Sequence, residues 1–318
     1  MRRVNRKERG AKTIIALFFL GWLLTAFRAG AANPHVGTTG FSFLKIDAAA
    51  RSAALGDAFV AAEGDINSMG VNPAGLATIG RTVGTASYTD YLLDTQLGFV
   101  GFGKRLTTKS FLGTGIRYIS YGKLQKTDKE HPTGEGLPSF RAGDWALQFC
   151  LGRAVSKRLF VGGTLKAIYS KIESYSSDGY AIDIGLLLKV PIADLSVGAS
   201  ALNIGFIRRG YSPGVQEVLP VNFKLGFAYR LAHLPLLLLG DINIPNDNDP
   251  YFCVGGEFTI ARMMFLRAGY NSLYDELGEE ASLSFGTGFL WGNYRIDYAY
   301  SRLAELGRVH RISLVSEF

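Results

Sequence analysis

The sequence predicts an all-β protein, a transmembrane antiparallel β-barrel of about fourteen strands that encloses a small, partly helical N-terminal plug. From residue 81 onward the chain repeats segments of about ten residues in which apolar side chains alternate with polar or small ones. The connections between these segments are alternately short and long, which is typical of barrels in bacterial outer membranes. The last segment ends on an aromatic residue, Phe318.

The first 31 residues have the order of a secretory signal peptide. Residues 1–13 are cationic, residues 14–27 are apolar, and Ala29-Gly30-Ala31 provides a small-x-small cleavage site. The apolar run is shorter than the roughly 20 residues that a spanning helix needs, which disfavours an N-terminal membrane anchor. We therefore predict cleavage after Ala31 or Ala32 and a location in the outer membrane of a bacterium with two membranes.

Composition and charge exclude several classes of protein. The chain is 47% hydrophobic and 19% charged, and neither a Gly-X-Y period nor a heptad runs along it, so disorder, collagen and coiled coil are excluded. Of the net charge of +7, +6 arises in the leader, which holds seven basic residues and one acidic residue. The 27 basic and 26 acidic residues that remain give no basic stripe, and we expect no nucleic-acid partner.

Residues 32–80 differ in composition from the rest of the chain and are predicted to form the plug segment. They are Ala-rich and compatible with helix at first, and are then punctuated by Gly and Pro. Residues 48–62 are rich in small side chains but only weakly amphipathic, so they suit close packing inside a barrel better than a surface helix.

Residues 81–318 are predicted to form the barrel. Alternation alone does not distinguish a barrel from a β-sandwich, in which the apolar face turns inward. The longer polar connections, at 123–140, 206–219 and 274–280, all follow odd-numbered segments, a regularity that a sandwich does not require. The predicted segments are residues 82–92, 95–105, 110–122, 141–153, 158–172, 178–190, 194–205, 220–231, 234–245, 251–261, 264–273, 281–291, 294–302 and 308–318.

Charged side chains of both signs are predicted on the face of the strands that turns away from lipid. Mutual neutralisation across a crowded lumen is favoured over a selective ion path. Fourteen strands enclose more space than side chains alone can fill, so a plug or water must occupy the rest. The candidate lumen-facing residues are Arg117, Asp144, Gln148, Lys166, Asp183, Lys224, Arg230, Asp241, Glu257, Arg267, Arg295 and Asp297.

Two leucine runs, 186–188 and 236–239, break the alternation and place Leu187, Leu237 and Leu239 on the inner face. Packing against an internal plug is the favoured interpretation, and an apolar path for a hydrophobic solute is the alternative. At the C-terminus, Ile312, Leu314 and Phe318 share one face of the last segment, as in chains that the barrel assembly machinery inserts. We interpret these three residues as a membrane-insertion signal.

The segment before the barrel resembles the N-terminal signature of the PorV/PorQ family, which belongs with the FadL-like outer-membrane barrels. The resemblance covers about residues 41–80. It implies a fourteen-stranded barrel with an inward-folded plug that contains the Asn-Pro-Ala element. Pro73 also excludes the helical conformation at Asn72, whose side chain can bond to neighbouring backbone. The matching residues are Phe43-Leu44-Lys45-Ile46, Ala50, Arg51, Ala53-Ala54-Leu55, Gly56, Asp57, Ala58-Phe59-Val60-Ala61, Asp65, Asn72, Pro73, Ala74, Gly75 and Leu76.

No constellation for catalysis, metal or cofactor stands out in the sequence. The four His are not spaced for a metal, and neither a Gly-x-Ser-x-Gly elbow nor a Walker loop occurs. Residues 246–249 lack the Gly and closing Glu of a calcium loop, which favours a solvated hairpin turn. Cys150 and Cys253 lie in separate strand-like runs, which favours two buried free thiols over a disulfide bridge. We therefore expect no enzymatic activity and no cofactor.

Two functions follow from the resemblance and the pattern. The first is a plugged conduit or docking component in outer-membrane transport or type IX-like protein secretion, with secretion subunits or secreted cargo as partners. The second is FadL-like passive transport of long-chain fatty acids or other hydrophobic solutes. An exported soluble β-sandwich that binds a ligand is the third alternative. For either barrel function, the expected partners also include outer-membrane lipid and, during biogenesis, the barrel assembly machinery.

Overall fold

A computed structural model of the chain describes residues 36–191, 194–212, 214, 217–277, 282–303 and 306–318. The predicted signal peptide lies outside these residues. Among the described residues, no helix combines the length and the apolar character that crossing a membrane requires.

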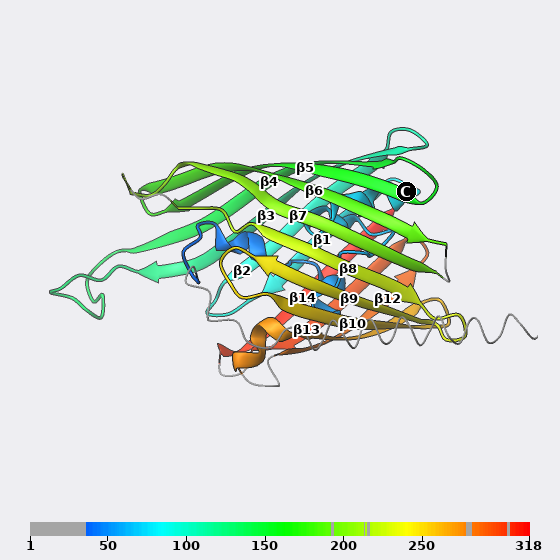
Figure 1. The fold of residues 1–318 in the computed structure, drawn as a ribbon. Helices are drawn as coiled ribbons and strands as arrows, with labels where there is room; N and C mark the ends of the chain where they lie inside the picture. The colour runs from blue at the N-terminus through cyan, green and yellow to red at the C-terminus, as the bar shows by residue number, and fades with distance from the viewer. Residues whose placement is uncertain (1–35, 192–193, 213, 215–216, 278–281, 304–305) are drawn as a thin grey trace, which may run out of the picture.

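Fourteen antiparallel strands form one closed barrel, in which each strand pairs with its neighbours in sequence and β1 pairs with β14 (Figure 1). Closure confirms the predicted fold class and shows that the sandwich alternative is wrong. The strands are β1 Val83–Asp90, β2 Gln96–Arg105, β3 Ser110–Gln125, β4 Ser139–Ala154, β5 Leu159–Ile172, β6 Tyr175–Val190, β7 Leu195–Arg209, β8 Asn222–Arg230, β9 Leu236–Pro245, β10 Tyr251–Ile260, β11 Met264–Asn271, β12 Leu283–Trp291, β13 Tyr294–Arg302 and β14 Arg308–Glu317.

Two of the predicted long loops are partly strand. Residues 123–125, 139–140 and 206–209 continue β3, β4 and β7 beyond the predicted ends. Alternation was a poor guide here because each region contains a bulge, which shifts the faces of the strand by one residue. One bulge interrupts β3 between Ser120 and Lys123. In β7 the pairing with β6 shifts its register around Asn203, whose φ is 59°, and again between Ile207 and Arg209.

The two ends of the barrel differ, as predicted. The connections after β2, β4, β6, β8, β10 and β12 are short in sequence and lie at one end, called here the short-turn end. The opposite, long-loop end carries the β3–β4 hairpin, which projects well beyond the other strands (Figure 1), and a 3-10 helix, η4, at Ser272–Leu277. In outer-membrane barrels short turns face the periplasm and long loops face outward, which fixes the orientation.

The outer surface of the barrel is apolar and its inner surface is mostly polar. Leu147, Phe149 and Leu151 of β4 are exposed to the outside, whereas Asp144 and Gln148 of the same strand are buried inside. Ile312 and Leu314 lie on the outer face of β14, and the backbone N–H of Phe318 donates to the carbonyl oxygen of Thr82 at 2.8 Å. This outer apolar band is the surface that contacts lipid.

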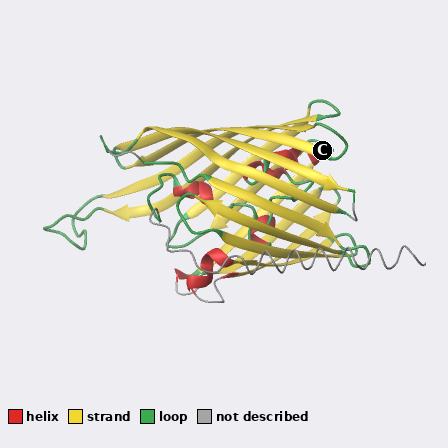
Figure 2. Cartoon of the chain, viewed as in Figure 1, coloured by secondary structure: helices red, strands yellow, loops and turns green. Residues whose placement is uncertain are grey.

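The plug fills the lumen with short helical turns joined by irregular chain (Figure 2). It contains η1 Ser42–Lys45, α2 Ala50–Ala54, η2 Ile66–Gly70 and η3 Pro73–Thr78. The helix-compatible stretch 48–62 is helical only over α2, because Gly56 and Asp57 both take left-handed backbone conformations that end it. The segment is thus partly helical, as the sequence predicts.

Candidate functional site

The plug runs from the long-loop end of the barrel to the short-turn end, and wall residues fix both of its ends. At the long-loop end the N–H of Gly40 donates to the carbonyl oxygen of Val218 at 3.0 Å. At the short-turn end the Arg105 guanidinium donates to the carbonyl oxygen of Ile79, shortly before β1 begins. Between them, Arg117 of β3 donates to the carbonyl oxygens of Leu44 and Ile46 at 3.2 and 3.1 Å.

Five buried side chains and the half-buried Arg295 form a closed circuit of ion pairs between plug and wall, called here the charge ring. Arg51 of the plug binds both carboxylate oxygens of Glu257 at 2.8 Å and the carboxylate of Asp65 at 2.9 Å. From the wall, Arg295 binds the same Asp65 oxygen at 2.6 Å. The circuit closes through the pairs Glu257–Arg267, Arg267–Asp297 and Asp297–Arg295, each at 2.7 Å.

Three positive and three negative charges balance within the charge ring. Burial alone would raise the pKa of Asp65, but Arg295 and Arg51 outweigh it and hold that pKa well below its usual range. Burial opposes the charge of Arg51, yet Glu257 and Asp65 keep its pKa above the ordinary value. Both plug members of the charge ring are therefore ionised at neutral pH.

Glycines in the wall let the plug backbone approach to contact distance. A Cβ built on Gly269 of β11 would lie 2.0 Å from the backbone nitrogen of Gly56, and one on Gly255 of β10 would lie 2.5 Å from the carbonyl oxygen of Leu55. Gly56 itself has a φ of +66°, which favours glycine. The turn after α2 is therefore seated directly on the backbone of β10 and β11.

The Asn-Pro-Ala element cross-links three parts of the structure. The Asn72 side-chain oxygen accepts from the N–H of Ala74 and caps η3, as the sequence predicts. Its amide nitrogen also donates to the carbonyl oxygens of Val60 in the plug at 2.7 Å and of Leu186 in β6 at 2.9 Å. Gly75 lies within η3, where a Cβ would come 2.8 Å from Ser68.

Replacing Asn72 with Ser is expected to retain the cap but lose both cross-links, because the serine hydroxyl cannot span to Val60 and Leu186. Loss of both hydrogen bonds, which leaves the buried Val60 carbonyl without its Asn72 donor, should lower the free energy of unfolding by about 1–2 kcal/mol. Denaturant titration of the detergent-solubilised protein measures the change, with the exposed turn variant Asn293→Ser as control. Equal stability of the two variants would contradict the assigned role of Asn72.

Asp57 titrates unusually for a carboxyl group. Burial, followed by repulsion from Asp47, raises its pKa to about 6, against the opposing effects of Arg311 and Lys224 and a 3.1 Å hydrogen bond from Asn271. The pKa of an aspartate in the unfolded chain is about 3.9. Between these two values the folded protein binds more protons than the unfolded chain does, so this group makes the fold less stable as pH rises from about 4 to 6.

Asp57→Asn should abolish this part of the pH dependence, because asparagine stays neutral and also tolerates the φ of 66°. We expect the variant to be more stable than the wild type at pH 7.5 and close to it at pH 4. Thermal unfolding at both pH values tests this, and parallel pH profiles of the two proteins would contradict it.

Most of the candidate lumen-facing residues lie inside the barrel. Asp241 accepts from the backbone N–H groups of Phe59 and Val60, and Lys166 binds Asp183 and Asn203, each at 2.7 Å. Arg230 shares the inward face of β8, but its side chain is exposed because it lies at the rim, where β8 ends. The others, apart from half-buried Lys224 and Arg295, are buried: Arg117, Asp144, Gln148, Lys166, Asp183, Asp241, Glu257, Arg267 and Asp297.

The inward-facing leucines pack against the plug. Leu187 and Leu239 are buried in one cluster with Leu55, Phe59 and other plug residues, and Leu237 packs against that cluster. The favoured interpretation of the leucine runs therefore matches the structure, whereas the apolar path is covered. Cys150 and Cys253 are free and buried, as favoured from the sequence.

One sequence interpretation was wrong in detail. Residues 246–249 form the β9–β10 turn, but Asp247 is buried and does not face solvent. Its carboxylate accepts from Lys45 at 2.6 Å and from Thr39 at 2.5 Å. The turn thus holds the N-terminal part of the plug, and no group of His, Cys, Asp or Glu among the described residues is arranged to hold a metal.

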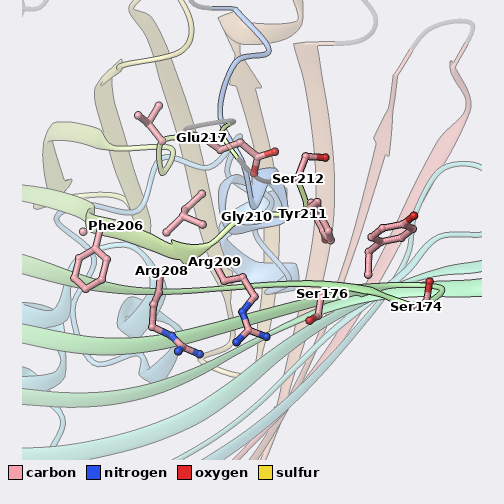
Figure 3. Close-up of a pocket in the computed structure, with 14 residues that line it drawn as sticks. Ser174, Ser176, Phe206, Arg208, Arg209, Gly210, Tyr211, Ser212 and Glu217 are labelled. Carbon is pink, nitrogen blue, oxygen red and sulfur yellow. The ribbon is translucent and has the colours of Figure 1, made fainter.

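A pocket of about 770 Å³ opens at the long-loop end, where β7 separates from β8 (Figure 3). Pairing of β7 with β8 stops at Leu202↔Asn222, whereas pairing of β7 with β6 continues to Arg209. Phe206, Arg208 and Arg209 line the pocket together with Ser174, just before β6, and Ser176 at its start (Figure 3). Tyr211 reaches from its rim to Ser170 of β5, which in turn contacts Asp144.

Comparison with known proteins agrees with this architecture. Residues 29–138 match the family model of type IX secretion system protein PorV. The toluene transporter TbuX of Ralstonia pickettii is 13% identical with a TM-score of 0.61, over 89% of this chain and 99% of that one. The toluene transporter TodX of Pseudomonas putida is 12% identical with a TM-score of 0.59, over 83% and 95%.

A FadL homologue from Pseudomonas aeruginosa is 12% identical with a TM-score of 0.55, over 91% of this chain and 100% of that one. No curated protein matches the chain. The PorV match spans the plug, β1, β2, β3 and the connection to β4, and it confirms the predicted resemblance. The chain thus has the FadL-like outer-membrane β-barrel fold, and its plug and first strands resemble those of PorV.

Proposed function

We propose that this protein is a non-enzymatic docking component of type IX-like outer-membrane protein secretion, and that its own lumen stays closed. The observation that carries the proposal is the plug, which the charge ring joins to β10, β11 and β13 and which touches the wall backbone at Gly255 and Gly269. The PorV match over the plug and the first strands supports the secretion role.

Closure of the lumen argues against a resident open channel. An internal pocket beside Asp57, Asn271, Tyr274 and Arg311 has a volume of about 10 Å³, room for about one water molecule. The inner leucines that would line an apolar path are covered by plug residues. For a solute to pass through the lumen, the plug would have to move and break the ion pairs that join it to the wall.

The β3–β4 hairpin and the pocket beside β7 are the surfaces that such a docking component offers outside the cell. The hairpin pairs as far as Gln125↔Ser139, beyond the barrel rim (Figure 1). Its polar tip has no role in closing the barrel, so its projection favours contact with another protein.

Shortening the hairpin is expected to remove docking and spare the fold. Residues 126–138 would be replaced by Asn-Gly, a sequence that favours a tight hairpin turn. Mild solubilisation from the native outer membrane, followed by purification and mass spectrometry, should show secretion subunits or secreted cargo with the wild type and at least about tenfold less with the variant.

The control is Asn293→Ser at the opposite end, which should copurify the same partners as the wild type. Both variants should show the mobility shift on boiling that marks a closed barrel. Wild-type protein that retains no secretion subunit or cargo, or a shortened variant that retains them in full, would contradict the docking role.

Passive transport of hydrophobic solutes is the second candidate. It is favoured by the pocket at the β7 edge, where Phe206, Ile207 and Val218 contribute apolar surface. The similar solved structures include proteins described as toluene transporters. Uptake of labelled toluene or oleate into proteoliposomes that hold the wild-type protein would support this function, and a closed plug predicts no uptake above that of empty vesicles.

A further inference from the structure

Charge is divided unequally between the two ends of the barrel. The mature sequence is nearly neutral, yet the short-turn end carries ten basic side chains against three acidic ones, whereas acidic side chains outnumber basic ones among the described residues of the long-loop end. The basic ones are Arg81, Lys104, Arg105, Lys109, Arg153, Lys157, Arg158, Lys189, Arg230 and Arg262, and the acidic ones are Glu63, Asp194 and Glu317.

Seven of these basic side chains are contiguous, and they are called here the basic face. They lie at the ends of β2, β4 and β6 and in the β2–β3 and β4–β5 turns. Backbone hydrogen bonds join these connections: the N–H of Ala154 donates to Lys109 at 2.7 Å, and that of Lys189 donates to Arg158 at 2.8 Å. The members of the basic face are Lys104, Arg105, Lys109, Arg153, Lys157, Arg158 and Lys189.

Most of the basic face has no counter-charge in the protein. Lys104, Lys109, Arg153, Lys157 and Arg158 are exposed, and none forms an ion pair within the described parts of the chain. Adjacent like charges repel, so their clustering is unfavourable unless an anion joins them.

One carboxylate already meets the basic face. Glu63 of the plug binds Lys189, whose ammonium also lies 5.4 Å from the centre of the Phe160 ring. Glu63 shows that this rim accepts a carboxylate at the mouth of the lumen.

The basic residues lie on both sides of the barrel wall. Lys104 and Arg153 follow the outward alternation of β2 and β4, whereas Arg105 and Lys189 follow the inward alternation of β2 and β6. Lipid headgroups surround the barrel from outside and do not reach the inward pair. A ligand that meets the inward residues and the turn tips together must lie beneath the mouth, in the periplasm.

We propose that the basic face binds an acidic segment of a periplasmic protein. Carboxylate side chains of that segment pair with the turn-tip cations Lys109, Lys157 and Arg158 and approach Lys189 beside Glu63. The assignment goes beyond the proposed docking of secretion partners at the outer surface, and it depends on the barrel orientation alone. It adds an interface at the opposite end of the molecule.

The test uses full mature protein in nanodiscs of zwitterionic phosphatidylcholine and a fluorescein-labelled twelve-residue oligoglutamate as the probe. Fluorescence anisotropy should show binding that weakens as NaCl rises from about 50 to 300 mM. The variant Lys109→Glu/Lys157→Glu/Arg158→Glu should bind at least about tenfold more weakly. A matched variant at the long-loop end, Lys123→Glu/Lys129→Glu/Arg141→Glu, should stay within about twofold of the wild type.

If both triple variants lose the same amount of oligoglutamate affinity, the proposal is overturned, because the peptide would then be attracted by the net charge of the protein and not by a particular site. Wild-type affinity in the turn-tip variant would overturn it as well. Loss confined to Lys104→Glu/Arg153→Glu would place the acidic probe on the outward side of the rim and overturn a site beneath the mouth of the lumen. A mobility shift on boiling confirms that each variant is folded, and none of these results depends on cargo docking outside.

Discussion

Replacing Arg51 with Met is expected to release the plug from the wall while leaving the barrel closed. The charge ring then holds two cations and three anions, so one buried negative charge is left uncompensated. Breaking a buried ion pair from one side costs about 3–5 kcal/mol. Because Arg51 also bridges Glu257 of the wall and Asp65 of the plug, its loss removes a direct link between them.

Hydrogen–deuterium exchange measures this release. Amides of residues 50–62 should exchange at least about 100-fold faster in Arg51→Met, whereas strand amides remain protected. The double variant Arg51→Met/Glu257→Gln restores balance, with two cations and two anions, and should recover part of the protection. Equal exchange in the wild type and the single variant would show that the charge ring does not hold the plug.

A methyl group on Gly269 is expected to have the second large effect. Its Cβ would lie 2.0 Å from the backbone nitrogen of Gly56, and neither backbone can rotate away as a side chain could. Overpacking of this kind costs about 1–3 kcal/mol. Gly269→Ala should therefore lower the temperature at which the protein loses its compact, heat-modifiable form, and Gly255→Ala should act in the same direction.

Gly256 supplies the matched control on the same strand as Gly255. It faces outward, and a Cβ there would lie 3.7 Å from the nearest side-chain atom, an ordinary contact. Gly256→Ala should change stability by no more than about 0.5 kcal/mol. A similar loss in Gly255→Ala and Gly256→Ala would point to strand propensity and away from contact with the plug.

The sequence predicts the barrel well because the physics of its strands is local. Each membrane strand must present an apolar face to lipid, so apolar and polar residues alternate along it. This alternation is visible in one strand's sequence without knowledge of its partner strands. The same reading fails where the constraint ends. Beyond Ser120 and around Asn203 the strands leave strict alternation through bulges, and the extensions of β3 and β7 were therefore predicted as loop.

The site is only partly readable from the sequence. Glu257 and Arg267 form a cross-strand pair, and Arg295 and Asp297 share one face of β13, so their inward position follows from alternation. That these four close a circuit with Arg51 and Asp65 depends on how an irregular segment lies in the lumen, which no periodicity encodes. The basic face was not predicted either, because the net charge of the sequence adds together the charges of both ends of the barrel.

Ion conductance across planar lipid bilayers tests the central claim, a lumen closed by a latched plug, most directly. Purified wild-type protein should insert without measurable conductance steps, whereas Arg51→Met should open transient steps because its plug leaves the wall more often. Steady conductance of the wild type would contradict the closed lumen. If Arg51→Met shows no more conductance steps than the wild type, the charge ring does not hold the plug in place.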